Sequence, residues 1–166
     1  MKNFQNKAKI IKVSKILRNI AFAGLVLWGI MIPASLATAI LPPLFSGQFS
    51  FPISAFLTVP MFVFAFLTNL KIFQFLDRLK NGCFFDTQTV GNLNAAGTWW
   101  LMMWLYEVVY CALGQTLCAD PLWSNPVDFS HFPPDLGGLF GALILKFFAW
   151  LFREAQELQE EQELTV

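Results

Sequence analysis

Two residues with opposite charges lie deep inside apolar parts of the sequence, where a charge is costly. Glu107 lies about halfway along the segment WWLMMWLYEVVYCALG, and Lys146 lies about ten residues into the apolar stretch that begins at Leu136. An ionised side chain in the hydrocarbon core of a membrane costs several kcal/mol unless it is paired. If the two segments are antiparallel neighbouring helices, both side chains reach similar depths and can meet.

Three interpretations of Glu107 and Lys146 stay open at this stage. The two can form a structural ion pair, or a protonated Glu107 can hold helices together through a hydrogen bond. Lys146 can instead extend toward the membrane surface while Glu107 binds another group. Finally, the two can belong to a proton or ion pathway, although one acid and one base make a short relay.

The rest of the sequence carries no pattern typical of catalysis. It contains no Gly-rich phosphate loop and no nucleophile elbow, so we expect a protein that is not an enzyme and that uses no cofactor. Cys118, Asp128 and His131 share one connection, but a lone His without a second ligand at metal spacing does not predict a metal site. A disulfide between Cys111 and Cys118 requires the helix to end near Gly114, and this alternative also stays open.

The elements that position these residues are four apolar stretches, at residues 16–41, 53–76, 95–117 and 136–152. A helix needs roughly 20 apolar residues to cross about 30 Å of hydrocarbon. With 56% hydrophobic residues and a mean hydropathy of +0.55 over 166 residues, the chain is too apolar for an ordinary soluble domain. We therefore predict a single-domain, all-α membrane protein with four transmembrane helices in a compact up-down bundle.

The charges predict the orientation of this bundle. Residues 1–15 form a basic segment, Lys71, Arg78 and Lys80 lie around the end of the second stretch, and Arg153 follows the fourth. The connections 42–52 and 118–135 contain no Lys or Arg. Because positive residues favour the cytoplasmic side, both termini and the middle connection are predicted to be cytoplasmic. A cleaved signal peptide ending near Ala37-Thr38-Ala39 is a weaker alternative, since the apolar run before it is long enough to span.

Local signals delimit the helices. We expect Pro33 to kink the first helix, and Pro42-Pro43 to end it. Small residues at Ala21, Gly24 and Gly29 permit close helix contact. The second helix should extend over residues 53–80 and stop at Asn81-Gly82, with Gly82 in the left-handed position after the helix.

The third helix should begin at Asp86, whose side chain can cap the free amides. Phe85 before it and Val90 after it can form a hydrophobic staple. Helices of this length exceed the hydrocarbon thickness, so the second and third helices should form a hairpin that projects into the cytoplasm. The fourth helix should continue into residues 153–166 as an acidic cytoplasmic tail.

Two motifs, the hairpin FLDRLKNGCFFDTQTV and the C-terminal EEQELTV, resemble a known family. It is the YoaS-like family of small bacterial four-helix membrane proteins, a domain of unknown function (DUF 2975). Its members have a Pro inside the second helix, here Pro60, then a basic turn, a Phe and a capping residue, and they end in Leu-Thr-Val. Asp86 stands where Ser is more usual. The resemblance implies the bacterial cytoplasmic (inner) membrane, no enzymatic activity, and a neighbouring gene for a small helix-turn-helix regulator.

These features favour a membrane-bound regulatory partner that holds a small helix-turn-helix regulator away from DNA. The alternative is an accessory subunit or a small transporter or channel organised around Glu107 and Lys146. We expect contact with the lipid bilayer and no direct binding to nucleic acid, and leave formation of a homo-oligomer open. The candidate partner-binding residues are the basic residues of the hairpin and the acidic residues of the tail: Lys71, Arg78, Lys80, Glu154, Glu157, Glu160, Glu161 and Glu163.

The topology can be tested with reporter fusions. Fusions placed after Lys80 and after Val166 should be active as cytoplasmic reporters, because the positive residues lie on that side. Fusions near Gly47 and Ser124 should report an external position. An external C-terminus would overturn the four-span orientation.

Overall fold

Four long helices make up the part of the chain that the structure describes. The computed structural model describes residues 2–46, 53–84, 86–117 and 136–164. The helices are α1 (Lys2–Ser46), α2 (Ile53–Lys80), α3 (Thr87–Leu117) and α4 (Leu136–Leu164). At 1.5 Å of rise per residue they are about 67, 42, 46 and 43 Å long, so each is longer than the roughly 30 Å hydrocarbon core.

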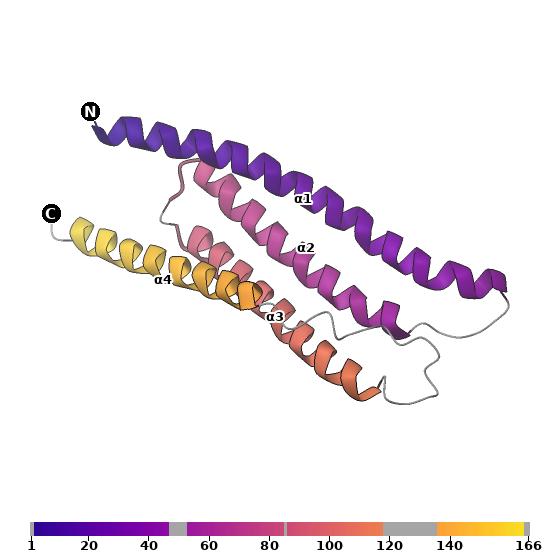
Figure 1. The fold of residues 1–166 in the computed structure, drawn as a ribbon. Helices are drawn as coiled ribbons and strands as arrows, with labels where there is room; N and C mark the ends of the chain where they lie inside the picture. The colour runs from indigo at the N-terminus through magenta and orange to yellow at the C-terminus, as the bar shows by residue number, and fades with distance from the viewer. Residues whose placement is uncertain (1, 47–52, 85, 118–135, 165–166) are drawn as a thin grey trace.

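The helices pack in the order of the chain. Close backbone contacts join α1 to α2, α2 to α3, and α3 to α4, whereas the described parts of α1 do not come close to α3 or α4. The ring of Phe75 on α2 meets the ring of Phe152 on α4 edge to face, with centroids 6.0 Å apart. The arrangement is therefore a more open series of antiparallel helices than the compact bundle expected from the sequence (Figure 1).

Both chain ends and the α2–α3 turn lie at the same end of the molecule (Figure 1). This follows because consecutive helices run in opposite directions, so the first and last helix ends and the middle turn come to one side. It brings the basic start of α1, the hairpin turn and the acidic end of α4 to one side. The C-terminal ends of α1 and α3 lie at the opposite end (Figure 1).

Three of the helices are long and apolar enough to cross a membrane. The candidate spans are Ala8–Ala37, Val59–Lys80 and Leu136–Gln162, which indicates a membrane protein. α3 is not among these candidates, because Gln88, Asn92 and other polar residues lie in its first half and Glu107 interrupts its more apolar second half. The span predicted at residues 95–117 stays a prediction.

Large apolar side chains on α1 and α4 point away from the rest of the chain. Ile20 of α1 is 63% exposed and Phe140 of α4 is 61% exposed, and many Leu, Ile, Val and Phe residues on the same two helices are similarly uncovered. A soluble monomer rarely exposes apolar patches of this extent. In a membrane these side chains contact lipid.

The prediction that Pro42-Pro43 ends the first helix is wrong, since α1 continues to Ser46. The basic segment and the first span are also one uninterrupted helix, without a turn near residue 15. Proline has a φ that suits a helix, and it removes only one donor. In lipid, an open backbone would leave several polar groups without partners, so continuing the helix is the better solution.

Small residues bring the helices together at two places. A Cβ added at Gly24 of α1 would lie 3.2 Å from Oδ1 of Asn69 on α2, and one added at Gly141 of α4 would lie 3.0 Å from the Trp100 ring of α3. Both glycines thus permit a close approach, since a side chain at either position would require Asn69 or Trp100 to shift. The expected role of Gly29 is not seen, because a Cβ there would meet nothing within 4 Å.

The α2–α3 turn ends α2 in the way that the sequence predicts. Gly82 has φ 84°, in the left-handed region. The amide of Cys83 donates to the carbonyl of Arg78 over 3.1 Å, and the amide of Gly82 donates to the carbonyl of Leu79 over 3.1 Å. These two bonds form a Schellman motif, which satisfies the last free carbonyls of the helix.

Replacing Gly82 should destabilise the hairpin. We expect Gly82→Ala to lower the free energy of unfolding by about 1–2 kcal/mol, because a Cβ is unfavourable in the left-handed region. Gly91→Ala is the matched control, since its added Cβ meets nothing within 4 Å, and it should be neutral or slightly stabilising. Denaturant titration of the purified protein in detergent measures both changes. Equal effects of the two substitutions would contradict the structural role of Gly82.

Candidate functional site

Polar contacts between helices are concentrated at the end that carries the α2–α3 turn. Nη1 of Arg18 on α1 lies 3.1 Å from Oδ1 of Asp77 on α2. Nε2 of Gln156 on α4 donates to Oγ1 of Thr87 on α3 over 3.2 Å. Together with the turn itself, these contacts connect all four helices at this end.

α3 begins at Thr87, directly after Asp86, but the side chain of Asp86 has a different role from the one expected. The amides of Thr89 and Val90 donate to the main-chain carbonyl of Asp86, over 2.8 and 3.1 Å. The carboxylate of Asp86 accepts a hydrogen bond from Nη1 of Arg78, so it joins the end of α2 to the start of α3. Phe85, the other half of the predicted staple, lies outside the described residues, and Val90 is buried.

The buried hydroxyl of Thr89 completes the turn. Thr89 is fully buried, and its Oγ1 donates to the carbonyl of Cys83 over 3.0 Å. This bond holds the backbone at Cys83 against the first turn of α3. Sequence analysis did not identify Thr89, although a threonine within the first turn of a helix is a position from which its hydroxyl can reach a neighbouring carbonyl.

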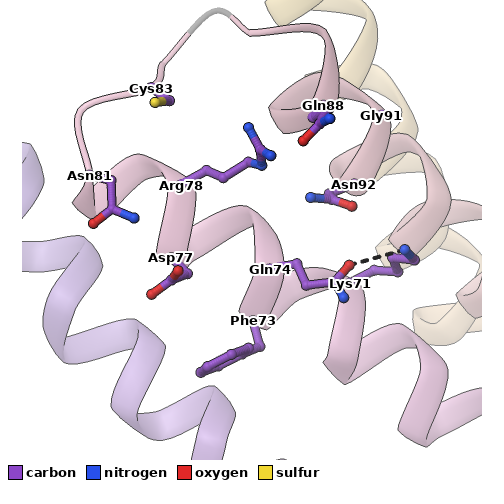
Figure 2. Close-up of a pocket in the computed structure, with 10 residues that line it drawn as sticks. All are labelled: Lys71, Phe73, Gln74, Asp77, Arg78, Asn81, Cys83, Gln88, Gly91 and Asn92. Atoms are coloured by element: carbon purple, nitrogen blue, oxygen red, sulfur yellow. Dashed lines mark hydrogen bonds between the residues drawn. The ribbon is translucent and has the colours of Figure 1, made fainter.

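A polar cavity of about 740 Å³ lies between α2 and α3 near the turn, and we call it the α2–α3 groove. It is lined by ten residues from the two helices and the turn: Lys71, Phe73, Gln74, Asp77, Arg78, Asn81, Cys83, Gln88, Gly91 and Asn92. Figure 2 shows the Arg78 side chain extended across the groove toward Gln88, with Phe73 and Asp77 on the side of α1. Lys71 and Arg78 were predicted to bind a partner and do line this groove, whereas Lys80 does not.

Four side-chain amides also line this groove, and none of them was predicted from the sequence. Gln74 on α2 and Asn81 directly after α2 are seven residues apart, and Gln88 and Asn92 are four apart on α3. Such spacings place each pair on one face of its helix. The spacing of these residues was therefore visible in the sequence, but only the packing of α2 against α3 brings the two faces together.

Lys146 does not meet Glu107. Nζ of Lys146 donates to Oδ1 of Asn94 over 3.1 Å and to Oγ1 of Thr98 over 2.7 Å, both on α3. Thr98 and Glu107 are nine residues apart, which is about 13 Å of helical rise. The expected pairing of Glu107 with Lys146 is therefore wrong in this structure: α3 is offset along α4, so that Lys146 faces the polar half of α3.

A second cavity, of about 650 Å³, lies between α3 and α4, and we call it the α3–α4 groove. Its lining combines Lys146 and Arg153 with the acidic residues Glu157 and Glu160. Nε of Arg153 donates to Oε1 of Glu157 over 3.0 Å. Opposite charges thus balance within this groove.

The acidic tail is helical as predicted, and its glutamates differ in their surroundings. Glu160 accepts a hydrogen bond from Nε2 of Gln156 over 2.9 Å, and Glu157 accepts one from Arg153. Glu154 and Glu161 are exposed and do not line the α3–α4 groove. The side chain of Glu163 lies outside the described residues. The described parts of α1 and α4 make no close backbone contact.

No group of three or more potential metal ligands occurs among the described residues. Cys118, Asp128 and His131 lie outside them, as does any bridge between Cys111 and Cys118. Cys83 is a free thiol exposed at the turn, and Cys111 is buried.

Comparison with known proteins identifies the family. The model of a family described as a protein of unknown function (DUF2975) matches residues 48–166, so the chain belongs to this family. The match agrees with the domain to which the hairpin and the C-terminal motif pointed. No curated protein and no solved structure matches the chain.

The contacts of Lys146 lead to a testable prediction. Lys146→Met and Thr98→Val, singly and together, should show a coupling energy of about 0.5–3 kcal/mol in unfolding experiments, because the two side chains share a hydrogen bond. Lys146→Met and Glu107→Gln should instead be additive within about 0.5 kcal/mol, since the groups lie far apart. Strong coupling between Lys146 and Glu107 would contradict the observed offset of α3 and α4.

Proposed function

We propose that this member of the DUF2975 family is a four-span membrane protein whose cytoplasmic end binds a small helix-turn-helix regulator through α4. It has a binding role rather than a catalytic one. Both termini and the α2–α3 turn are cytoplasmic in this proposal, and the membrane is the bacterial inner membrane.

The packing of α3 supports a crossing by all four helices. At about 46 Å it is as long as its neighbours, and it packs against both α2 and α4. Its second half exposes Met102, Leu105 and Val109. α3 lies between two membrane-spanning neighbours and has apolar side chains that face outward. If it crosses the membrane with them, these side chains contact lipid and its backbone keeps its hydrogen bonds.

The observation that carries the proposal is the outer face of α4 beyond Arg153. Glu154, Leu158 and Glu161 follow one another at intervals of four and three residues, which places them on one face. All three are exposed, and Leu158 is 58% exposed. Buried Ala142 and Ala149 lie on the other side of the helix, toward α3. An apolar side chain flanked by carboxylates, beyond the apolar part of the helix, suits a partner with a basic surface.

A helix-turn-helix regulator has such a surface, because it must neutralise DNA phosphates. The resemblance of the sequence motifs to the YoaS-like proteins implied a neighbouring gene for a regulator of this kind. Binding of the acidic face to that basic surface would compete with DNA and keep the regulator at the membrane. The alternative role as a transporter or channel is less well supported, because Lys146 is engaged by Asn94 and Thr98 instead of Glu107.

Two matched pairs of substitutions test the tail. Glu154→Gln with Glu161→Gln removes two charges from the outer face, whereas Glu157→Gln with Glu160→Gln removes two charges that line the α3–α4 groove. Gln preserves helix propensity. We expect the outer pair to weaken regulator binding about five- to tenfold at low salt, and the inner pair to change it less than about twofold. Pull-down of the regulator with the detergent-solubilised protein measures this.

Replacing all five glutamates of the tail extends the test. The variant should still insert into the membrane, but it should lose its salt-sensitive partner and change transcription of its own locus. Its substitutions are Glu154→Gln, Glu157→Gln, Glu160→Gln, Glu161→Gln and Glu163→Gln. Full recovery of the partner and unchanged transcription would leave the glutamates as a solubilising surface and would end the regulatory proposal.

A further inference from the structure

The α2–α3 groove holds more positive charge than its own contacts neutralise. Arg78 and Asp86 pair across the turn, and Asp77, the carboxylate that lines the groove, pairs with Arg18 of α1. Lys71 is the exception. Its Nζ donates to Oε1 of Gln74 over 3.0 Å, so its partner is a neutral amide. One net positive charge therefore remains at the groove.

The neutral residues of the groove are also suited to bind an anion. Gln74, Asn81, Gln88 and Asn92 each carry an amide group with two donors, and Arg78 has further N–H donors beyond the one that binds Asp86. Figure 2 shows the side chains of Arg78, Gln88 and Asn92 close together across the groove. Several N–H donors around an ammonium and a guanidinium are the arrangement that binds phosphate oxygens.

The position of Lys71 along α2 is a second reason to expect an anion in the groove. Lys71 is half-buried and lies within the candidate span Val59–Lys80, nine residues before its end, which is about 13 Å along the helix. A lysine at this depth is costly unless it is paired or can reach the membrane surface. The groove extends from Lys71 to Asn81 and Cys83 at the turn, so an anion at the membrane surface can reach the ammonium.

We infer that the α2–α3 groove binds a phosphate group, with Lys71 and Arg78 as the charged donors and the surrounding amides as neutral donors. Two sources present this chemistry at the inner face of a membrane: the headgroup of an anionic phospholipid and a soluble phosphate compound. The volume of about 740 Å³ accommodates more than a bare phosphate ion. The site is separate from the outer face of α4, so it does not depend on the proposed regulator.

The α3–α4 groove is a poorer candidate for an anion. It also contains two basic residues, but Glu157 and Glu160 line it and Arg153 is already bound to Glu157. An incoming phosphate would meet two carboxylates there. The comparison of the two grooves shows that the balance of charge, more than the size of the cavity, distinguishes the phosphate site.

Lipid titration tests the inference. The full-length protein in a neutral detergent is titrated with phosphatidylglycerol or with zwitterionic phosphatidylcholine, and bound lipid is measured by native mass spectrometry. We expect preferential binding of phosphatidylglycerol. Lys71→Gln should weaken it about five- to tenfold, because one charge-assisted contact is lost. Lys80→Gln, the matched control, removes the same charge from the same helix outside the groove and should change binding less than about twofold.

A second variant keeps the test decisive if Lys71→Gln disturbs folding. Gln88 is exposed, so Gln88→Glu should fold normally while placing a negative charge at the groove, and it should weaken phosphatidylglycerol binding to a similar extent. In a protein with Cys118→Ser, the exposed Cys83 offers a further readout. Bound phosphatidylglycerol should slow alkylation of Cys83, and Lys71→Gln should abolish this protection.

Competition with millimolar inorganic phosphate distinguishes the two sources. Displacement of phosphatidylglycerol by phosphate identifies a site for soluble phosphate compounds, and retention of the lipid identifies a headgroup site. Equal binding of both lipids with no effect of phosphate on Cys83 alkylation would overturn the inference. Equal losses in Lys71→Gln and Lys80→Gln would also overturn it, since they would show attraction to the general surface charge alone.

Discussion

The absence of water in a lipid bilayer is the constraint on which the whole structure depends. Every backbone N–H and C=O in the hydrocarbon region needs a partner within the chain, and a helix provides these partners residue by residue. This is why α1 continues past Pro33 and Pro42-Pro43, where a helix in water would have reason to stop. It also explains why so many large apolar side chains of α1 and α4 remain uncovered by protein. Lipid takes the place of a core.

With little apolar surface hidden between helices, the specific arrangement depends on a few close contacts. Glycines at positions 24 and 141 allow α1 to approach α2 and α4 to approach α3. At the end that carries the turn, the contacts are polar: Arg18 with Asp77, Arg78 with Asp86, and Gln156 with Thr87. These bonds connect the four helices where water is available to the remaining donors and acceptors. The surfaces best suited to binding are consequently at this end.

In the two grooves and the tail, some charged residues pair with each other within the chain, and others are placed to bind a ligand or a partner. Arg153 and Glu157 neutralise each other, as do Arg78 and Asp86, and an exposed pair such as Arg153–Glu157 contributes little to stability. In the α2–α3 groove Lys71 is held only by an amide, and on the outer face of α4 Glu154 and Glu161 are exposed. A DUF2975 protein built in this way can present a basic groove and an acidic helix face at the same end without their cancelling each other.

The sequence by itself determined the helical stretches and the boundaries at the α2–α3 turn, because these depend on short-range physics, whereas the end of α1 did not follow the proline signal. The bounds of α2, the left-handed Gly82 and the start of α3 after Asp86 all follow from residues within one or two turns. The tertiary structure alone decided which faces meet. The offset between α3 and α4 places Lys146 beside Asn94 and Thr98 and away from Glu107, and no periodicity within one helix specifies that offset. The α2–α3 groove has the same origin: its amides come from two helices, and only their packing makes one site of them.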